Sequence, residues 1–466
     1  MAFLADRAER RARRRVLFPA RSRRSASVPL PLGERRPGRA RALSRESRRA
    51  APPARGAVRD FEIHAPPQSP PASRSDGGRS GVTARGQRWA SLAAVALAFA
   101  GLYFRVITAL PPGGFAPPPS AARAASTAPP LYEAQLLPNT SAASVHSATA
   151  AEISGGRLRA FWYGGSREGA SDVAIYTSVY SLRQKDWSPE SAVVTREFAQ
   201  RHLRRSVRKL GNPVAGRDSK GRLCLYFVSV SVGGWAGSAV NLMVSEDEGE
   251  TWSPPRRLIA SPFFNISTLV KGAPLLFSGG GVGLPVYHEL LGKFGELLRL
   301  DAEGRAIGKT RLSWGQSSLQ PVIVPRSQTE AVGFMRYAGN PPNRILMVRT
   351  EDGGVHWSAP AKTALPNPNA AIASLSLSGG PLLLVFNNAE ENREDLSLAL
   401  SADFGHTWRI AHRFEGASGP APAPVPEYSY PWIVQDRDGD VHVLYTWGRS
   451  RIKHVRFNRA WLEGRR

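Results

Sequence analysis

The sequence has 466 residues and only one cysteine, Cys224. A single cysteine excludes a disulfide within the chain, although a large core needs none, so a location outside the cytoplasm is still allowed. Cys224 lies in the apolar run GRLCLYFVSV, which is typical of a strand. We therefore expect a buried thiol that packs as a small hydrophobic side chain.

The sequence also lacks motifs for metal, nucleotide or phosphate binding. His288, His442 and His454 do not have the spacing of metal ligands, and no Cys/His cluster is present. The stretch SGGGVG is rich in glycine, but it lies inside a strand hairpin rather than at a turn from strand to helix. No cofactor and no metal is therefore expected.

Acidic residues are scarce, with 37 Asp and Glu against 62 Lys and Arg, which gives a net charge of +25. Residues 1–88 hold 22 Arg and only seven acidic residues. Residues 1–86 show no helical or strand periodicity, so we interpret them as a disordered basic tail. They are either a solvated tail or translated sequence upstream of a true start near Val82, and no nucleic-acid partner is expected.

An apolar run follows, from Trp89 to Phe104, without a charged residue. Extending it to residues 88–110, with Arg105 reaching toward the interface, gives the length of about 20 residues that a bilayer span requires. The excess of Arg before it predicts an inner-membrane signal anchor, with the rest of the chain on the periplasmic or extracellular side. A cleaved signal peptide is the alternative, but its small-residue site SAARAAS comes late after the run. Residues 111–130, rich in Pro and Ala, are interpreted as a linker.

From residue 131 the pattern is all-β, because short apolar runs alternate with Gly, Asn, Asp and Pro turns. Six segments begin with or near Gly and continue as an apolar strand, and each follows another apolar run. These strand segments are 155–163, 221–229, 279–287, 329–337, 379–387 and 439–447. Six hairpins at intervals of about 50 residues predict a six-bladed β-propeller over residues 131–462, stabilised by closure of the ring.

A second repeat has the form S/T-x-D-x-G-x-T/H-W and occurs at 245–252, 350–357 and 401–408. Its Asp and Ser/Thr side chains can bond to their own backbone, and its Gly can adopt a positive φ. We interpret the repeat as a structural hairpin turn whose Trp packs into the blade. Worn copies are expected near DAEGRAIGK, from Asp301, and at Trp187.

The inner strand of each blade should line the axis of the propeller, and the residue that opens it is polar in all six repeats. A ring of six binding residues is the favoured interpretation, and six polar residues that cap turns is the alternative. The ring consists of His146, Asn212, Lys271, Gln320, Asn369 and Tyr430.

With these repeats the chain resembles the sialidase superfamily, the six-bladed propellers with Asp-box (BNR) repeats, over about residues 140–460. The segment FWYGGSREGASDVAIYTS is similar to the first-blade loop of sialidases. The resemblance implies that Asp172 is the general acid/base and Arg167 a substrate contact, against the alternative that Asp172 only opens a strand. The segment YSYPWIVQDRDGDVHVLYTW resembles the stretch with the nucleophilic tyrosine and indicates Tyr430, with Tyr428 as the alternative in register.

A tyrosine nucleophile suits a sugar whose anomeric carbon bears a carboxylate, because a carboxylate nucleophile would be repelled there. The phenol needs a carboxylate base within hydrogen-bond reach, since its ordinary pKa is about 10. Glu289 is the first candidate for this base and Glu427 the second.

The chain departs from the sialidase pattern at the clamp of three arginines that holds the substrate carboxylate. His146 stands where the first arginine is expected, and Arg336, Arg344, Arg449 or Arg451 could supply the others. Sialic acid itself is therefore in doubt, and His146 and Lys271 are expected to contact an acidic or neutral sugar.

The resemblance implies an exo-glycosidase that acts on the terminal sugars of a glycan. With the anchor predicted from residues 88–110 it would be attached to the membrane, and we expect a monomer. The alternatives are a non-catalytic propeller that binds carbohydrate or protein, and a different glycan reaction, such as that of a lyase, on the same scaffold.

Overall fold

The computed structural model describes residues 80–108, 113–116, 128–261, 265–315, 317–378, 380–416 and 426–465. Residues 1–79 of the predicted basic tail and most of the predicted linker lie outside the described residues. Three α-helices are described, α1 (Ser80–Thr108), α2 (Arg196–Leu203) and α3 (Arg459–Glu463). None of the helices in these ranges is both long and apolar enough to cross a membrane.

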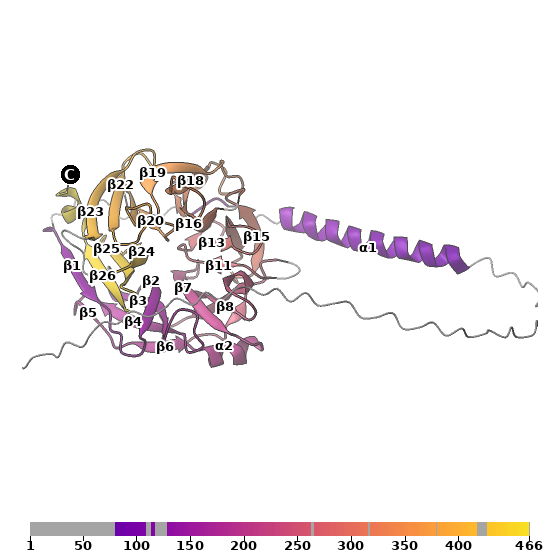
Figure 1. Cartoon of the computed structure of the whole chain (residues 1–466), viewed down its shortest axis with the longest axis horizontal. Helices are drawn as coiled ribbons and strands as arrows, with labels where there is room; N and C mark the ends of the chain where they lie inside the picture. The colour runs from indigo at the N-terminus through magenta and orange to yellow at the C-terminus, as the bar shows by residue number, and fades with distance from the viewer. Residues whose placement is uncertain are drawn as a thin grey trace, which may run out of the picture. The chain divides into compact units, whose positions relative to one another are not determined.

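The strands form six antiparallel sheets arranged around a central axis, so the predicted six-bladed all-β propeller is confirmed (Figure 1). In the first five sheets the strand order follows the chain, with the inner strand first, and the sixth sheet adds β1 (Tyr132–Leu136) outside its last strand. The strands of blades 1 to 3 are β2 (Ser144–Ile153), β3 (Arg157–Gly165), β4 (Ala174–Ser181), β5 (Asp186–Trp187) and β6 (Ser191–Val194); β7 (Lys209–Arg217), β8 (Leu223–Val230), β9 (Ser238–Ser245) and β10 (Arg256–Arg257); and β11 (Leu269–Val270), β12 (Leu275–Leu276), β13 (Val282–His288), β14 (Phe294–Leu300) and β15 (Ala306–Arg311).

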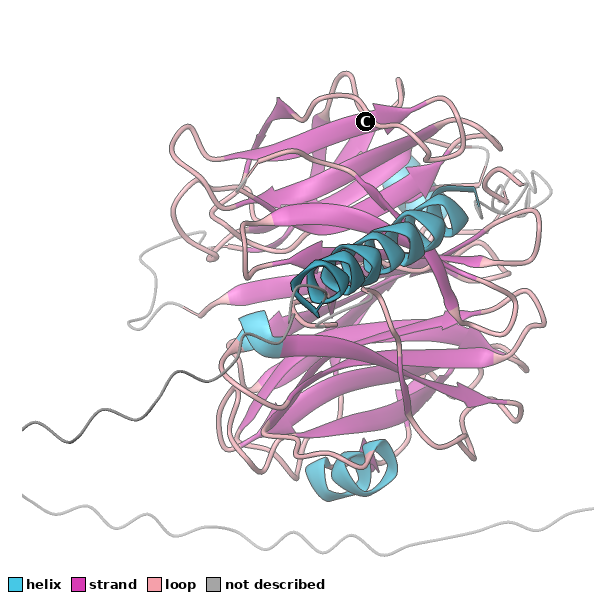
Figure 2. Ribbon diagram, turned by 90° about the vertical axis from the view of Figure 1, so that its right-hand side faces the viewer, coloured by secondary structure: helices cyan, strands magenta, loops and turns pink. Residues whose placement is uncertain are grey.

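Blades 4 to 6 repeat the arrangement, and the side view in Figure 2 shows the strands of the separate sheets. Their strands are β16 (Ser318–Pro325), β17 (Ala331–Tyr337), β18 (Arg344–Thr350) and β19 (Ala361–Pro366); β20 (Ala373–Ser376), β21 (Leu382–Phe386), β22 (Leu396–Ser401) and β23 (Arg409–Glu415); and β24 (Tyr428–Gln435), β25 (Val441–Trp447) and β26 (Arg451–Phe457).

The ring is closed by β1 (Tyr132–Leu136), which is the outermost strand of the last blade and pairs with β26. Asn458 reinforces this closure, because its Oδ1 accepts from the backbone N–H of Leu131 at 3.0 Å and its Nδ2 donates to the carbonyl of Pro129 at 2.8 Å. The same Oδ1 caps α3 by accepting from the N–H of Trp461. The two ends of the propeller thus share one blade, which removes a free junction.

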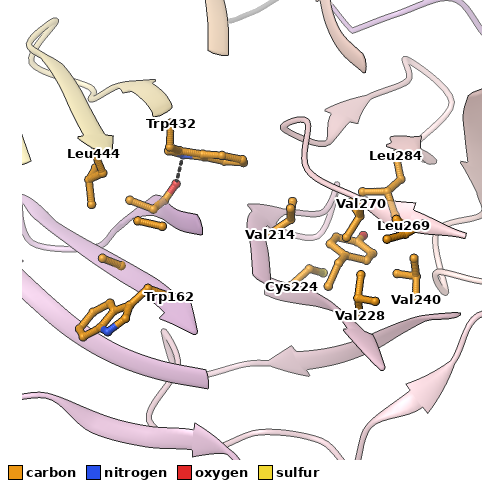
Figure 3. Close-up of a cluster of buried hydrophobic side chains, with 14 of the residues drawn as sticks. Trp162, Val214, Cys224, Val228, Val240, Leu269, Val270, Leu284, Trp432 and Leu444 are labelled. Atoms are coloured by element: carbon orange, nitrogen blue, oxygen red, sulfur yellow. Dashed lines mark hydrogen bonds between the residues drawn. The ribbon is translucent and has the colours of Figure 1, made fainter. Parts of the chain in front are cut away.

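Apolar side chains fill the space between neighbouring blades (Figure 3). The cluster shown there runs from Trp432 of blade 6 to Trp162 of blade 1, Val214 of blade 2 and Leu284 of blade 3. Trp432 satisfies its indole N–H by donating to the carbonyl of Ala150 at 2.9 Å, which ties blade 6 to blade 1. Cys224 belongs to this cluster and is 3% exposed, as expected, and burial raises the pKa of its thiol to about 12.

The Asp-box repeats form hairpin turns, as the sequence predicted, and the structure places them between the third and fourth strands of their blades. In the first box Asp247 accepts from the N–H and hydroxyl of Thr251 at 2.8 and 2.6 Å, while Gly249 has a φ of 94°. These bonds lower the pKa of Asp247 to about 2. Trp252 packs edge-on against Phe161 of the preceding blade, so the box also joins neighbouring blades.

Candidate functional site

The inner strands share a backbone irregularity at the end where they begin. The pairing of β7, β16 and β24 with the next strand shifts register at Asn212, Gln320 and Tyr430. These residues have φ values of 42°, 51° and 53°, and each precedes a proline. A positive φ is uncommon for residues other than glycine, and a bulge redirects the side chain of the residue that carries it.

The redirected side chains meet at the axis around Tyr430. Gln320 Nε2 donates to the phenol oxygen of Tyr430 at 3.1 Å, and the rings of His146 and Tyr430 have their centroids 4.2 Å apart. Lys271 Nζ donates to the carbonyl of Pro431 at 3.0 Å. The inner strands of blades 1, 3, 4 and 6 therefore converge on one side chain.

The remaining two ring residues, Asn212 and Asn369, join the others through Tyr287 and Arg336. Asn212 Nδ2 donates to the phenol oxygen of Tyr287 at 3.2 Å, and Gln320 reaches the same oxygen at 3.4 Å. Asn369 Oδ1 accepts from Arg336 Nε at 2.6 Å. All six polar residues expected at the axis thus lie in one network, which we call the axial cluster.

The nitrogen bases of the axial cluster are buried and hold their protons weakly. Burial lowers the pKa of Lys271 to about 7. Burial also holds the pKa of His146 well below its usual value, with a further contribution from the charge of Arg449. Beside Lys271 and Trp432 the structure leaves a void of only about 10 Å³. The axial cluster lies at the end of the axis where the inner strands begin, and we call this side of the propeller the funnel face.

Three arginines surround the axial cluster, but two of them already have acidic partners. Arg393 and Arg449 each bond to Glu427 at 2.9 Å, and Arg449 NH1 also bonds to Glu168 at 2.8 Å. These bonds lower the pKa of Glu427 to about 2 against the opposing effect of burial.

Arg336 differs from the other two because it bonds only to neutral groups. Its NH1 donates to Gln320 Oε1 at 3.1 Å and lies 3.5 Å from the phenol oxygen of Tyr430. No acidic side chain among the described residues pairs with it. Arg336 is therefore the guanidinium at the axis that is free to meet an anionic group.

Asp172 and Arg167 lie in the β3–β4 loop, on the face of the propeller where the inner strands begin. Asp172 is exposed, and its carboxylate accepts from the N–H of Ser166 at 2.8 Å and from the Ser166 hydroxyl at 3.0 Å. These bonds lower the pKa of Asp172. Arg167 is exposed and makes no side-chain hydrogen bond within the described ranges. The loop residue joined to the axial cluster is Glu168, through Arg449.

Glu289 follows β13 directly and is half-buried. Burial raises the pKa of its carboxyl, although the charges of Arg336 and Lys293 act in the opposite direction. Burial raises the pKa of Tyr287 as well, with contributions from Tyr430 and Glu289 that place these groups in one electrostatic environment. The Glu289 carboxylate has no hydrogen-bond partner in the described part of the chain, so it is available to exchange a proton.

Sequence reasoning missed Arg393, Glu168 and Tyr287. Arg393 and Glu168 lie in the loops between the second and third strands of blades 5 and 1, and Glu289 occupies the corresponding loop of blade 3. This shared position in the blade was the signal that could have found Arg393 and Glu168. Within the described ranges, no three His, Cys, Asp or Glu side chains gather as metal ligands.

A family model described as "BNR repeat-like domain" matches residues 156–443, more than half of the chain. No curated protein matches the sequence. Among solved structures, a protein of unknown function from Dyadobacter fermentans is 14% identical, with a TM-score of 0.57 over 70% of this chain and 98% of that one.

Two sialidases have the same fold. The NanB sialidase from Streptococcus pneumoniae is 12% identical, with a TM-score of 0.55 over 69% of each chain. The Trypanosoma rangeli sialidase, solved with sialic acid, is 14% identical, with a TM-score of 0.51 over 70% of this chain and 55% of that one. Identities this low show the fold and not the activity. By its match to the family model, this chain belongs to the BNR repeat-like domain family, and its six-bladed propeller is sialidase-like.

Proposed function

We propose that the protein is an exo-glycosidase that cleaves a terminal sugar from a glycan by a retaining mechanism with Tyr430 as the nucleophile. The observation that carries the proposal is the placement of the Tyr430 phenol oxygen at the axis, between donors from Gln320 and Arg336. These two donors hold the oxygen in a fixed position, from which it can attack a sugar bound at the axis.

In the first step, the Tyr430 oxygen bonds to the anomeric carbon while the bond from that carbon to the leaving oxygen breaks. The phenol proton passes to a carboxylate, and Glu289 fits this role because burial raises its pKa. A carboxyl of the β3–β4 loop protonates the leaving oxygen. In the second step, water attacks the anomeric carbon and the same loop carboxylate takes its proton. The bond from that carbon to the Tyr430 oxygen breaks, and the phenolate takes back its proton from Glu289.

The acid of the β3–β4 loop is proposed to be Asp172, as the resemblance implies. Its bonds to Ser166 lower its pKa, so it must exchange these bonds for the substrate before it can donate a proton. Glu168 of the same loop is the competing candidate, because its contact with Arg449 places it beside the axial cluster. Separate Asp172→Ala and Glu168→Gln variants distinguish the two.

The arginines bear on the substrate class. Of the three arginines around the axial cluster, only Arg336 lacks an acidic partner among the described residues, so these arginines offer one unpaired guanidinium and not three. We infer a terminal sugar with a single anionic group held by Arg336, or a neutral sugar held by Gln320, Asn369 and Asn212. The predicted membrane attachment through residues 88–110 and the location outside the cytoplasm remain predictions.

A panel of fluorogenic sialosides, uronides and neutral glycosides tests the proposal. The Tyr430→Phe variant should lose turnover by about 10³-fold or more on the substrate that wild type cleaves. Tyr428→Phe is the matched control, because Tyr428 opens the same strand but belongs to the core between blades. Equal turnover by Tyr430→Phe would exclude this nucleophile. Binding of glycans without any turnover would favour the non-catalytic propeller.

A further inference from the structure

A hollow of about 670 Å³ lies between blades 2 and 3. It is lined by residues of four segments: the chain after α2, the β8–β9 loop, the connection from β10 to β11, and the β13–β14 loop. All four segments lie on the face where the inner strands begin. Leu290 of the lining directly follows Glu289, and Trp235 packs on Gly211, where a Cβ would come within 2.7 Å of the indole.

Large apolar side chains protrude around this hollow. Val232, Ile259 and Leu291 are 76%, 63% and 82% exposed, and Ile266 and Leu290, which line the hollow, are 36% and 45% exposed. These are five of the nine exposed large hydrophobic side chains described in the propeller. Single exposed apolar residues are ordinary, but a cluster marks a surface that contacts something.

The same rim is strongly basic. Four exposed arginines lie in α2 or just after it, and a fifth, Arg257, lines the hollow. None of the five has an acidic partner among the described residues, and no Asp or Glu lines the hollow. The four are Arg201, Arg204, Arg205 and Arg208. We call these arginines and the five apolar side chains the basic–apolar rim.

We propose that the basic–apolar rim docks on an anionic lipid surface. Guanidinium groups bond well to phosphate, and clustered cations are attracted to anionic headgroups. Apolar tips gain free energy by entering the boundary between headgroups and acyl chains. A soluble polyanion would engage the arginines but leave the tips of Val232 and Leu291 in water. Docking would turn the face that carries the axial cluster toward sugars at that surface.

The proposal is independent of the predicted span at residues 88–110. Residues 113–116 follow that span and are held at the opposite face, where Phe115 N–H donates to the carbonyl of Gln328 and Ala116 N–H to that of Leu276, both at 2.8 Å. A membrane contact made by the span would therefore change the emission of a label near the opposite face. A contact made by the rim would change the emission of a label at the funnel face. Labels on the two faces separate these cases.

The full-length protein allows such labels because its single cysteine is buried. An environment-sensitive nitrobenzoxadiazole label is attached at Leu291→Cys on the rim, or at Gln184→Cys in the β4–β5 turn at the opposite end of blade 1. Vesicles of phosphatidylcholine are compared with vesicles in which about a third of the lipid is phosphatidylglycerol. We expect emission from the rim label to rise severalfold with anionic vesicles only, while the label at 184 stays unchanged.

Charge variants complete the test. Arg205→Gln combined with Arg208→Gln should lower the partition coefficient on anionic vesicles by about 25-fold, the effect of losing two cations near a charged surface. Arg183→Gln combined with Arg305→Gln removes the same charge from turns at the opposite face and should leave partition within about twofold. Equal responses of the two labels, equal binding to neutral vesicles, equal losses in the two double variants, or retention on heparin without vesicle binding would each overturn the proposal. Turnover of a soluble glycoside, measured in parallel, reports on the proposed function separately.

Discussion

Replacing Lys271 with Met is predicted to stabilise the propeller at neutral and acidic pH. Lys271 is 2% exposed, and its ammonium has one hydrogen bond, to the carbonyl of Pro431, besides its place 5.2 Å from the ring centroid of Trp432. Burial lowers its pKa from 10.5 to about 7. The folded protein therefore holds this charge at a cost that the unfolded chain does not have.

The magnitude follows from the two pKa values. Between pH 7 and 10.5 the unfolded chain binds a proton at Lys271 that the folded protein has released, so the free energy of unfolding of wild type rises by about 1.4 kcal/mol per pH unit. The full range corresponds to roughly 5 kcal/mol. Met has a similar volume and no charge, and it forfeits only one hydrogen bond of about 1 kcal/mol. The variant should be several kcal/mol more stable than wild type below pH 7, and this advantage should shrink as the pH rises toward 10.

Urea unfolding followed by tryptophan fluorescence between about pH 6 and 9.5 measures this difference. Lys220→Met is the matched control, because the Lys220 side chain is 51% exposed and should show no such dependence on pH. A gap between wild type and Lys271→Met that stays constant over this range would refute the reasoning. It would mean that the folded protein keeps the ordinary pKa of this lysine.

Three further outcomes are expected. Ser166→Ala removes a bond that lowers the pKa of Asp172, so the limb of the pH–rate profile that Asp172 governs should move to higher pH, and an unmoved profile would remove Asp172 from the mechanism. Glu289→Gln should lower kcat by about 10²-fold or more with an unchanged Tm, and full activity would exclude it as the base of the phenol. Asn458→Ala should lower the free energy of unfolding by about 1–3 kcal/mol in calorimetry, because it removes the hydrogen bond to the N–H of Leu131 before the closing strand and the N-cap of α3. The exposed Asn392→Ala is the control and should cause no change.

The blades and their turns could be predicted from the sequence because they rest on short-range interactions. The alternation of apolar strands with Gly turns is local, and so are the bonds of the Asp boxes, such as those from Thr407 to Asp403. The polar residues at the start of the inner strands could be predicted for the same reason. Each stands at a fixed place in a repeat, and the symmetry of the ring brings equivalent places together.

The ion pairs of the site could not be predicted in this way. Glu427 was a candidate base in the sequence, but in the structure it accepts from Arg393 and Arg449, which lie on loops of blades 5 and 6. Nothing in the sequence near Glu427 indicates these partners. The bond from Ser166 to Asp172 depends on the path of one loop. The closure of the ring by β1 could not be predicted from local sequence either, since Leu131 and Asn458 are 327 residues apart.

The bulges connect the fold to the site. Asn212, Gln320 and Tyr430 precede prolines, a position that favours extended backbone, yet all three have positive φ. Such backbone costs about 1–3 kcal/mol per residue and persists only when the surrounding structure holds it. Regular inner strands would close the ring equally well, so stability alone does not account for the same strain in separate blades. In these three blades the strained residue turns its polar side chain toward the axis, where Gln320 meets Tyr430. The closed ring supplies the packing that holds these conformations, and this is why a site made of residues so far apart in sequence depends on the pairing of β1 with β26.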